Sequence, residues 1–83
     1  MRVWGKIKVE DRIQDDVTLE CGDFESGLLK VCEHFDLTKP IIVGKHQNEI
    51  NRFFRTIFYP DDFIESVNFD TLEIEILVEK KKS

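Results

Sequence analysis

The residues able to bind a metal or to act as nucleophiles are few and widely spaced. The soft or borderline ligands are Cys21, Cys32, His34 and His46. Structural zinc sites usually pair their ligands two to four residues apart, and only Cys32 and His34 are that close. Because residues two apart on a helix point in different directions, we expect no metal site. A Cys32 thiolate with a histidine base would need a convergence that the spacing does not indicate, so we expect two reduced, buried thiols.

Carboxylate pairs and one glycine-lysine step are the other patterns with a chemical interpretation. Adjacent acids occur at Asp15, Asp16, Asp61 and Asp62. Acid–base catalysis needs two carboxylates in different environments, whereas adjacent acids in turns are usually caps or solvated surface. Gly44 and Lys45 lie between a predicted strand and a predicted helix, which is the setting of an anion site. The glycine pattern of a P-loop is absent, so we expect no catalytic residue and no cofactor.

Basic residues gather in the middle of an otherwise acidic chain. Residues 37–59 contain four basic residues and one acid, a net charge of +3 in a chain whose net charge is −5. Lys45, His46, Arg52 and Arg55 are candidate contact residues on a helix face that could touch phosphates or an acidic partner. The alternative is a solvated face, or ion pairs with the protein's own acids. The negative net charge opposes general coating of nucleic acid.

Period-two alternation predicts strands at both ends of the chain. Residues 70–79 alternate apolar side chains with glutamates, which is typical of a half-buried strand. Residues 2–9 and 12–21 alternate in the same way. We therefore expect three strands from these segments.

The connection between the first two strands sets their register. A three-residue connection pairs Val9 with Ile13 and Val3 with Leu19, and so puts both apolar sets on one face. Asp15 then falls among the inward positions, which indicates an edge, a bulge or a frayed hairpin end.

The middle of the chain predicts two helices and a short strand. Asp23 is placed to cap a helix whose apolar stripe is formed by Phe24, Leu28, Val31, Cys32 and Phe35. Residues 41–43 are apolar and β-branched, which predicts a strand. Residues 46–55 predict a second helix with Ile50, Phe53, Phe54 and Ile57 facing inward.

These elements give an α+β domain in the order ββαβαβ. We expect a small, mostly antiparallel sheet of three to four strands with two helices on one face. Residues 1–79 form one domain and residues 80–83 a solvated basic tail. We expect no signal peptide and no membrane span. The two cysteines form no short motif, so we expect a cytoplasmic protein.

Charge on the outer face of the strands predicts their order. The first strand presents Lys6 and Lys8 there, and the last presents Glu73, Glu75 and Glu79. Opposite charges across a strand pair attract, so we expect the first strand to lie between the second and the last.

That order leaves Trp4 on the open face of the sheet. It would lie near Leu77 in an apolar spot ringed by charges, where self-association or partner binding is expected. Alternatively, Trp4 packs against a chain terminus or a loop.

Four pieces of the chain, residues 1–6, 52–58, 62–65 and 69–74, resemble a group of small acidic bacterial proteins. The resemblance implies a stand-alone bacterial domain. The group has no assigned activity, so the resemblance implies no site residues.

Together these features predict a small interaction or regulatory module that acts through protein–protein contacts, without catalysis, metal or membrane. One alternative is a nucleic-acid-associated protein that uses residues 39–55. The second is a small enzyme or enzyme subunit, which requires a polar cleft.

Overall fold

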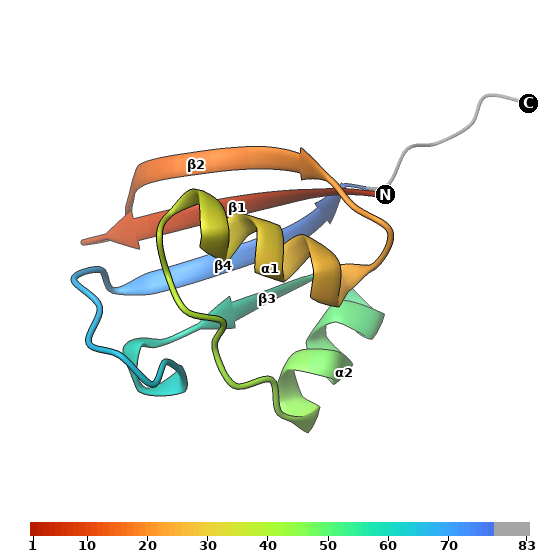
Figure 1. Cartoon of the computed structure of the whole chain (residues 1–83). Helices are drawn as coiled ribbons and strands as arrows, with labels where there is room; N and C mark the ends of the chain where they lie inside the picture. Colours follow the sequence, from red (N-terminus) through yellow and green to blue (C-terminus); the bar gives the residue numbers. More distant parts are fainter. Residues whose placement is uncertain (78–83) are drawn as a thin grey trace, which may run out of the picture.

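The computed structural model describes residues 1–77, which form one four-stranded sheet and two helices (Figure 1). In chain order the elements are β1 (Arg2–Val9), β2 (Arg12–Glu20), α1 (Phe24–His34), α2 (Gly44–Phe53), β3 (Arg55–Phe58), the 3-10 turn η1 (Pro60–Asp62) and β4 (Thr71–Leu77). The end of the predicted domain 1–79 and the predicted tail 80–83 lie outside the described residues.

The sheet is antiparallel throughout and its strands lie in the order β2-β1-β4-β3. The α+β class is therefore confirmed, and so is the position of the first strand between the second and the last. Lys6 lies directly opposite Glu73 across the β1–β4 pair, as the charge pattern predicts.

The third strand follows the second helix instead of preceding it. Residues 41–43 form no strand, because the carbonyl of Val43 accepts the first hydrogen bonds of α2. The strand is β3, which begins where Phe54 adopts a left-handed conformation and ends α2. Thr56 and Phe58 then face the core, while Ile57 faces outward. The prediction that Phe53, Phe54 and Ile57 face the core from a helix was therefore wrong.

The β1–β2 hairpin closes through a two-residue turn at Glu10 and Asp11, both of which have positive φ. A turn with positive φ at both central residues matches the twist of the flanking strands. Val9 therefore pairs with Arg12, and the predicted Val9–Ile13 pairing was wrong. The predicted pairing of Val3 with Leu19 is confirmed, because a bulge in β2 beside Asp15 shifts the register by one residue.

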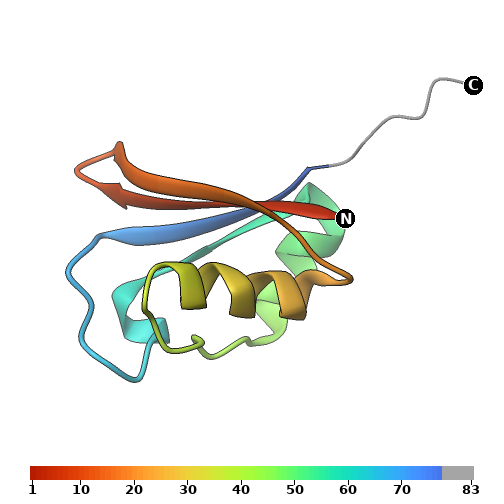
Figure 2. The ribbon, with the colours of Figure 1, turned by 45° about the horizontal axis from the view of Figure 1, so that its top comes forward.

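Both helices cover the same face of the sheet (Figure 2). Helix α1 begins at an Asp23 cap, whose side chain accepts a hydrogen bond from the Ser26 amide, and it lies over β1 and β2. Its approach is close: a Cβ added at Gly27 would lie 3.0 Å from the Cγ atoms of Val3. A Cβ at Gly5 of β1 would lie 2.5 Å from Val31 Cγ1, so glycine at these two positions allows the helix to reach the sheet.

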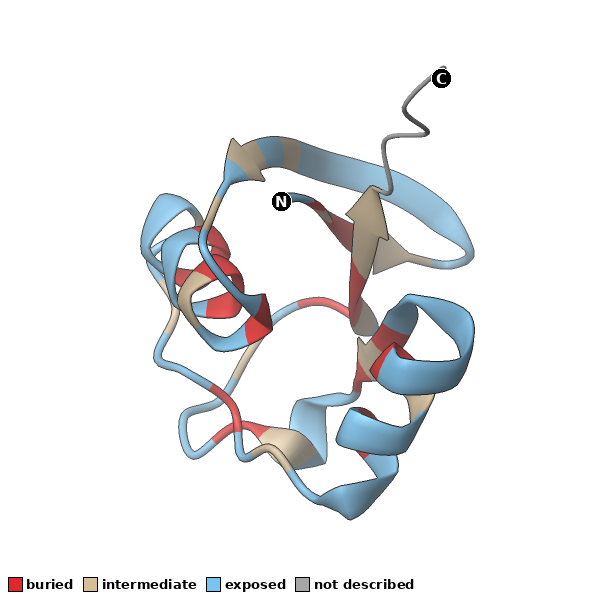
Figure 3. Cartoon of the chain, turned by 90° about the vertical axis from the view of Figure 1, so that its right-hand side faces the viewer, coloured by how far each residue is buried: buried red, intermediate tan, exposed pale blue. Residues whose placement is uncertain are grey.

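The core lies between this helix layer and the sheet, where the buried segments gather (Figure 3). It also holds the loop between β3 and β4 in place through a row of aromatic rings. The ring of Phe63 lies edge-on to both Phe58 and Phe69. This loop, which contains the 3-10 turn η1, is therefore anchored by two buried phenylalanines.

Candidate functional site

The outer face of the sheet carries an ionic cluster of two lysines and two glutamates. Lys6 Nζ lies 3.2 Å from carboxylate oxygens of both Glu73 and Glu75, and Lys8 Nζ lies 2.8 Å from Glu73. Although neither α1 nor α2 covers this face, the Lys6 and Glu73 side chains are only 7% and 6% exposed. Their neighbours bury them, so these charges satisfy one another inside the protein.

Trp4 belongs to the same cluster. Its Nε1 donates a 2.8 Å hydrogen bond to Asp16, and Lys6 Nζ lies 3.8 Å from the centroid of its ring. Trp4 lies opposite Glu75, and Leu77 lies one outer-face position further along β4. Two polar neighbours, Asp16 and Lys6, therefore already contact Trp4, while its role as a partner contact stays a prediction.

The lysines change the titration of Glu73. Burial alone would raise the pKa of this carboxyl, but hydrogen bonds from Lys8 and Lys6 outweigh burial and hold the pKa below its ordinary value. The negative charge of Glu73 is thus favoured in the folded protein, as expected for an ion pair with a structural role.

His46 is buried, with 1% of its surface exposed, so its side chain does not lie on the predicted basic face. Its Nδ1 accepts a 3.1 Å hydrogen bond from the amide of Val43, just before α2, and its ring stacks on Phe58 at 4.3 Å. Nε2 lies 3.7 Å from a carboxylate oxygen of Asp62. His46 therefore bonds to the backbone at the start of α2 and packs its ring in the core.

The remaining basic residues are exposed but divide between the two ends of α2. Lys45 lies at its start, where Nζ is 5.2 Å from the centroid of the Tyr59 ring. Arg52 and Arg55 lie at its end and just beyond. Within residues 1–77, no carboxylate forms an ion pair with any of these three cations. Two cations close together in the chain therefore lie at the C-terminal end of α2, and one lies at its N-terminal end.

Between those arginines lie two exposed phenylalanines, and we call Arg52, Phe53, Phe54 and Arg55 the aromatic corner. Phe53 is 63% exposed and Phe54 is 50% exposed. The Arg52 guanidinium lies 5.9 Å from the centroid of the Phe53 ring. The two rings place adjacent apolar surface beside two cations, which makes the corner a candidate interaction site.

Phe54 is held in a backbone conformation that disfavours its own side chain. Its φ is 59°, in the left-handed region. Glycine is the usual residue at the end of a helix in this conformation, and other residues there pay on the order of 1–3 kcal/mol. Phe54 stays in place because its amide donates to the Ile50 carbonyl and its own carbonyl accepts from the amide of Ile76. Such strain often accompanies a functional surface.

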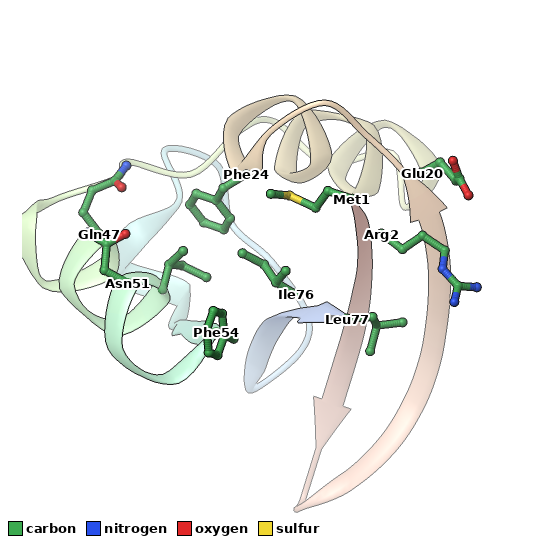
Figure 4. Close-up of a pocket in the computed structure, with 10 residues that line it drawn as sticks. Met1, Arg2, Glu20, Phe24, Gln47, Asn51, Phe54, Ile76 and Leu77 are labelled. Carbon is green, nitrogen blue, oxygen red and sulfur yellow. The ribbon is translucent and has the colours of Figure 1, made fainter. Parts of the chain in front are cut away.

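A cavity of about 690 Å³ opens beside Phe54, between α2, the start of α1 and the ends of β1 and β4. Its apolar lining consists of Met1, Phe24, Ile50, Phe54, Ile76 and Leu77. Figure 4 shows Phe24, Met1, Ile76 and Phe54 around its centre, with Gln47 and Asn51 on α2 at its rim. A second hollow of about 520 Å³ shares Phe54, Ile76 and Leu77 with it and adds Phe53 and Arg55. The aromatic corner thus lies between two surface hollows.

Both cysteines are free thiols, with Cys32 buried and Cys21 half-buried. Burial raises the pKa of Cys32 to about 11, so this thiol stays protonated at neutral pH and is a poor nucleophile. Within the described part of the chain, no three histidine, cysteine or acidic side chains lie close enough to hold a metal ion.

Arg52, Arg55, Lys45 and Leu77 were predicted as contact residues. Arg55 and Leu77 line the second hollow together with Phe54, and Arg52 lies over the Phe53 ring. The two phenylalanines were missed because their spacing from Ile50 also fits a buried helix stripe. The sequence feature that could have identified them is the run from Arg52 to Arg55, in which two aromatic residues lie between two cations.

None of the helices in residues 1–77 is long and apolar enough to cross a membrane. Comparisons with protein-family models, with curated proteins and with solved structures found no match to this chain.

Proposed function

We propose that this protein is a small cytoplasmic interaction module, without catalysis, that binds a partner protein through the aromatic corner. The observation that carries the proposal is the pair Phe53 and Phe54, exposed side by side next to the two hollows. The chain's resemblance to small acidic bacterial proteins supports a bacterial origin for the module.

Burial of the two rings against a partner supplies the binding energy. Full burial of a phenylalanine contributes roughly 1.5–3 kcal/mol, and aromatic and arginine residues beside a pocket are the usual hot spots of protein interfaces. The left-handed Phe54 is compatible with the same conclusion, because residues held in strained backbone conformations cluster at functional surfaces. Arg52 and Arg55, which form no ion pair within residues 1–77, add a preference for an acidic partner.

The test compares the wild-type protein with a Phe53→Ser/Phe54→Ser variant in quantitative affinity purification and in sedimentation. We expect the double variant to remain folded but to lose the captured partner, or its dimer if the partner is a second copy. Ile64→Ser is the matched control, because Ile64 is 81% exposed in the loop between β3 and β4. Equal capture by the double variant and by the control would reject the proposal.

Nucleic acid is a second candidate partner, because two arginines enclosing two exposed rings also suit base stacking and phosphate contacts. The net charge of −5 and the distance of Lys45 from the aromatic corner favour a protein partner instead. A labelled single-stranded oligonucleotide distinguishes the two: binding that falls steeply with salt and disappears in the Phe53→Ser/Phe54→Ser variant would favour nucleic acid.

A further inference from the structure

The backbone of β3 has one free side. Among the strands of residues 1–77, β3 is at the edge of the sheet and pairs only with β4. The carbonyl of Phe54 accepts a hydrogen bond from the amide of Ile76. Because bonding alternates along an antiparallel pair, Thr56 and Phe58 also direct their backbone groups toward β4. The amides and carbonyls of Arg55 and Ile57 therefore point away from the sheet.

This edge is short, at four residues, and carries the charge of Arg55, but it has no bulge, proline or inward-pointing charge. Edge strands are commonly blocked by bulges, prolines or inward-pointing charges, and β2, the opposite edge, has a bulge beside Asp15. Strand β3 pairs with β4 in unbroken register, and its sequence contains no proline. A groove of about 250 Å³ runs along it, lined by Glu49, Phe53, Arg55, Thr56 and Ile57.

The charges beside this edge select the partner. Arg55 projects on the outer face, as does Glu75 across from it, but Glu75 is already bonded to Lys6. Glu49 on the inner side accepts a hydrogen bond from the Thr56 hydroxyl. Arg55 therefore has no ion pair with a carboxylate within residues 1–77, while Phe53 offers an apolar contact on the side of α2. An added strand that alternates acidic and apolar residues meets both requirements, since alternate side chains face opposite ways.

We propose that β3 binds an extended segment of a partner protein as a fifth, antiparallel strand, with acidic side chains beside Arg55 and apolar side chains beside Phe53. The inference rests on the proposed function, since it specifies how the partner occupies the aromatic corner. Main-chain hydrogen bonds to Arg55 and Ile57 supply affinity, and the alternating side chains supply specificity.

The test uses a blocked peptide of alternating glutamate and valine, titrated against the wild-type protein by fluorescence anisotropy. In antiparallel pairing, the residue opposite Arg55 directs its own amide toward β3. N-methylation of the glutamate amides should therefore weaken binding by about tenfold or more, the equivalent of one lost hydrogen bond. N-methylation of the valine amides, which face away from β3, should leave binding unchanged. A control peptide with lysine in place of each glutamate should bind the wild-type protein weakly. The Arg55→Glu variant should instead prefer the lysine peptide to the glutamate peptide.

On the protein side, Ile57→Pro removes the outward amide but none of the hydrogen bonds to β4, and it should weaken binding as the N-methylated peptide does. The peptide series keeps the test valid if this variant does not fold. Equal binding by all N-methylated peptides would overturn strand addition, as would displacement of the peptide by an oligonucleotide. If Phe53→Ser/Phe54→Ser still abolishes partner capture in that case, the proposed function stands and only the mode of docking is wrong.

Discussion

The outer face of the central strands and the aromatic corner use the same residue types in opposite ways. On the outer face, the Trp4 ring packs against Lys6, and Lys6 is bonded to two glutamates. At the corner, Phe53 and Phe54 lie beside two arginines that form no ion pair within residues 1–77. Aromatic and basic side chains that satisfy one another stabilise the fold, whereas the corner arginines, without a carboxylate partner within residues 1–77, fit the proposed binding role.

The largest expected effect follows from removing a charge on the outer face. Lys6→Met removes the charged hydrogen bonds to Glu73 and Glu75 and leaves buried Glu73 with only Lys8 beside it, so we expect a loss of about 2–3 kcal/mol of unfolding free energy. Arg55→Met is the matched control and should change the free energy of unfolding by less than about 0.5 kcal/mol, because Arg55 is exposed. Denaturant unfolding measures both.

A further substitution separates lost pairing from lost packing. The Lys6→Met/Glu73→Gln double variant removes the buried carboxylate together with the buried lysine. Part of the lost free energy of unfolding should therefore return. A Lys6→Met variant as stable as Arg55→Met would contradict the distinction between the two surfaces.

Acidification should weaken the outer face selectively. The lowered pKa of Glu73 means that the unfolded chain binds this proton more readily than the folded protein does. The stabilisation is therefore complete above the unfolded pKa, near 4.5, and is lost as pH falls through the lower folded value. We expect Glu73→Gln to flatten the dependence of the unfolding free energy on pH in this acidic range, while Arg55→Met leaves it unchanged. Parallel pH profiles for Glu73→Gln and wild type would show that Glu73 is not stabilised in its charged form.

The elements with strong periodicity could be predicted from the sequence. Strands β1, β2 and β4 follow from alternation, α1 follows from its stripe and its Asp23 cap, and the strand order follows from the lysines and glutamates on the outer face. These signals are long and consistent with one another, so tertiary contacts do not override them.

The segment from residue 41 to residue 58 was less predictable, because its signals are short. Three apolar residues at 41–43 resemble a buried strand, and periodicity alone does not distinguish a short strand from an extended loop. Phe53 and Phe54 continue a helical stripe from Ile50, whereas the helix ends through a left-handed Phe54, which is uncommon for a residue other than glycine. The exposed arginines of the candidate site could be foreseen, while its aromatic residues were assigned to the core.

A smaller effect is expected at Trp4. Trp4→Phe keeps an aromatic ring near Lys6 but loses the hydrogen bond from Nε1 to Asp16. One such hydrogen bond contributes about 1 kcal/mol, and this is the loss of unfolding free energy we expect. Partner capture should be unaffected if the aromatic corner is the contact surface. Loss of the partner in Trp4→Phe without loss of stability would instead move the binding site to the outer face.

The smallest effect on stability is expected at Phe54, where the effect on binding is large. Phe54→Gly relieves the left-handed strain, about 1 kcal/mol or more, and removes a half-buried ring that contributes a similar amount. The two changes offset each other, so the free energy of unfolding should stay within about 1 kcal/mol of wild type while partner capture is lost. Phe54→Ala is the matched control, because it removes the ring but keeps a Cβ in the strained conformation. We expect Phe54→Gly to be the more stable of the two by about 1 kcal/mol, measured by denaturant unfolding. Equal stability of these two variants would mean that the backbone of Phe54 carries no strain. The conformation of Phe54 would then give no support to a binding role.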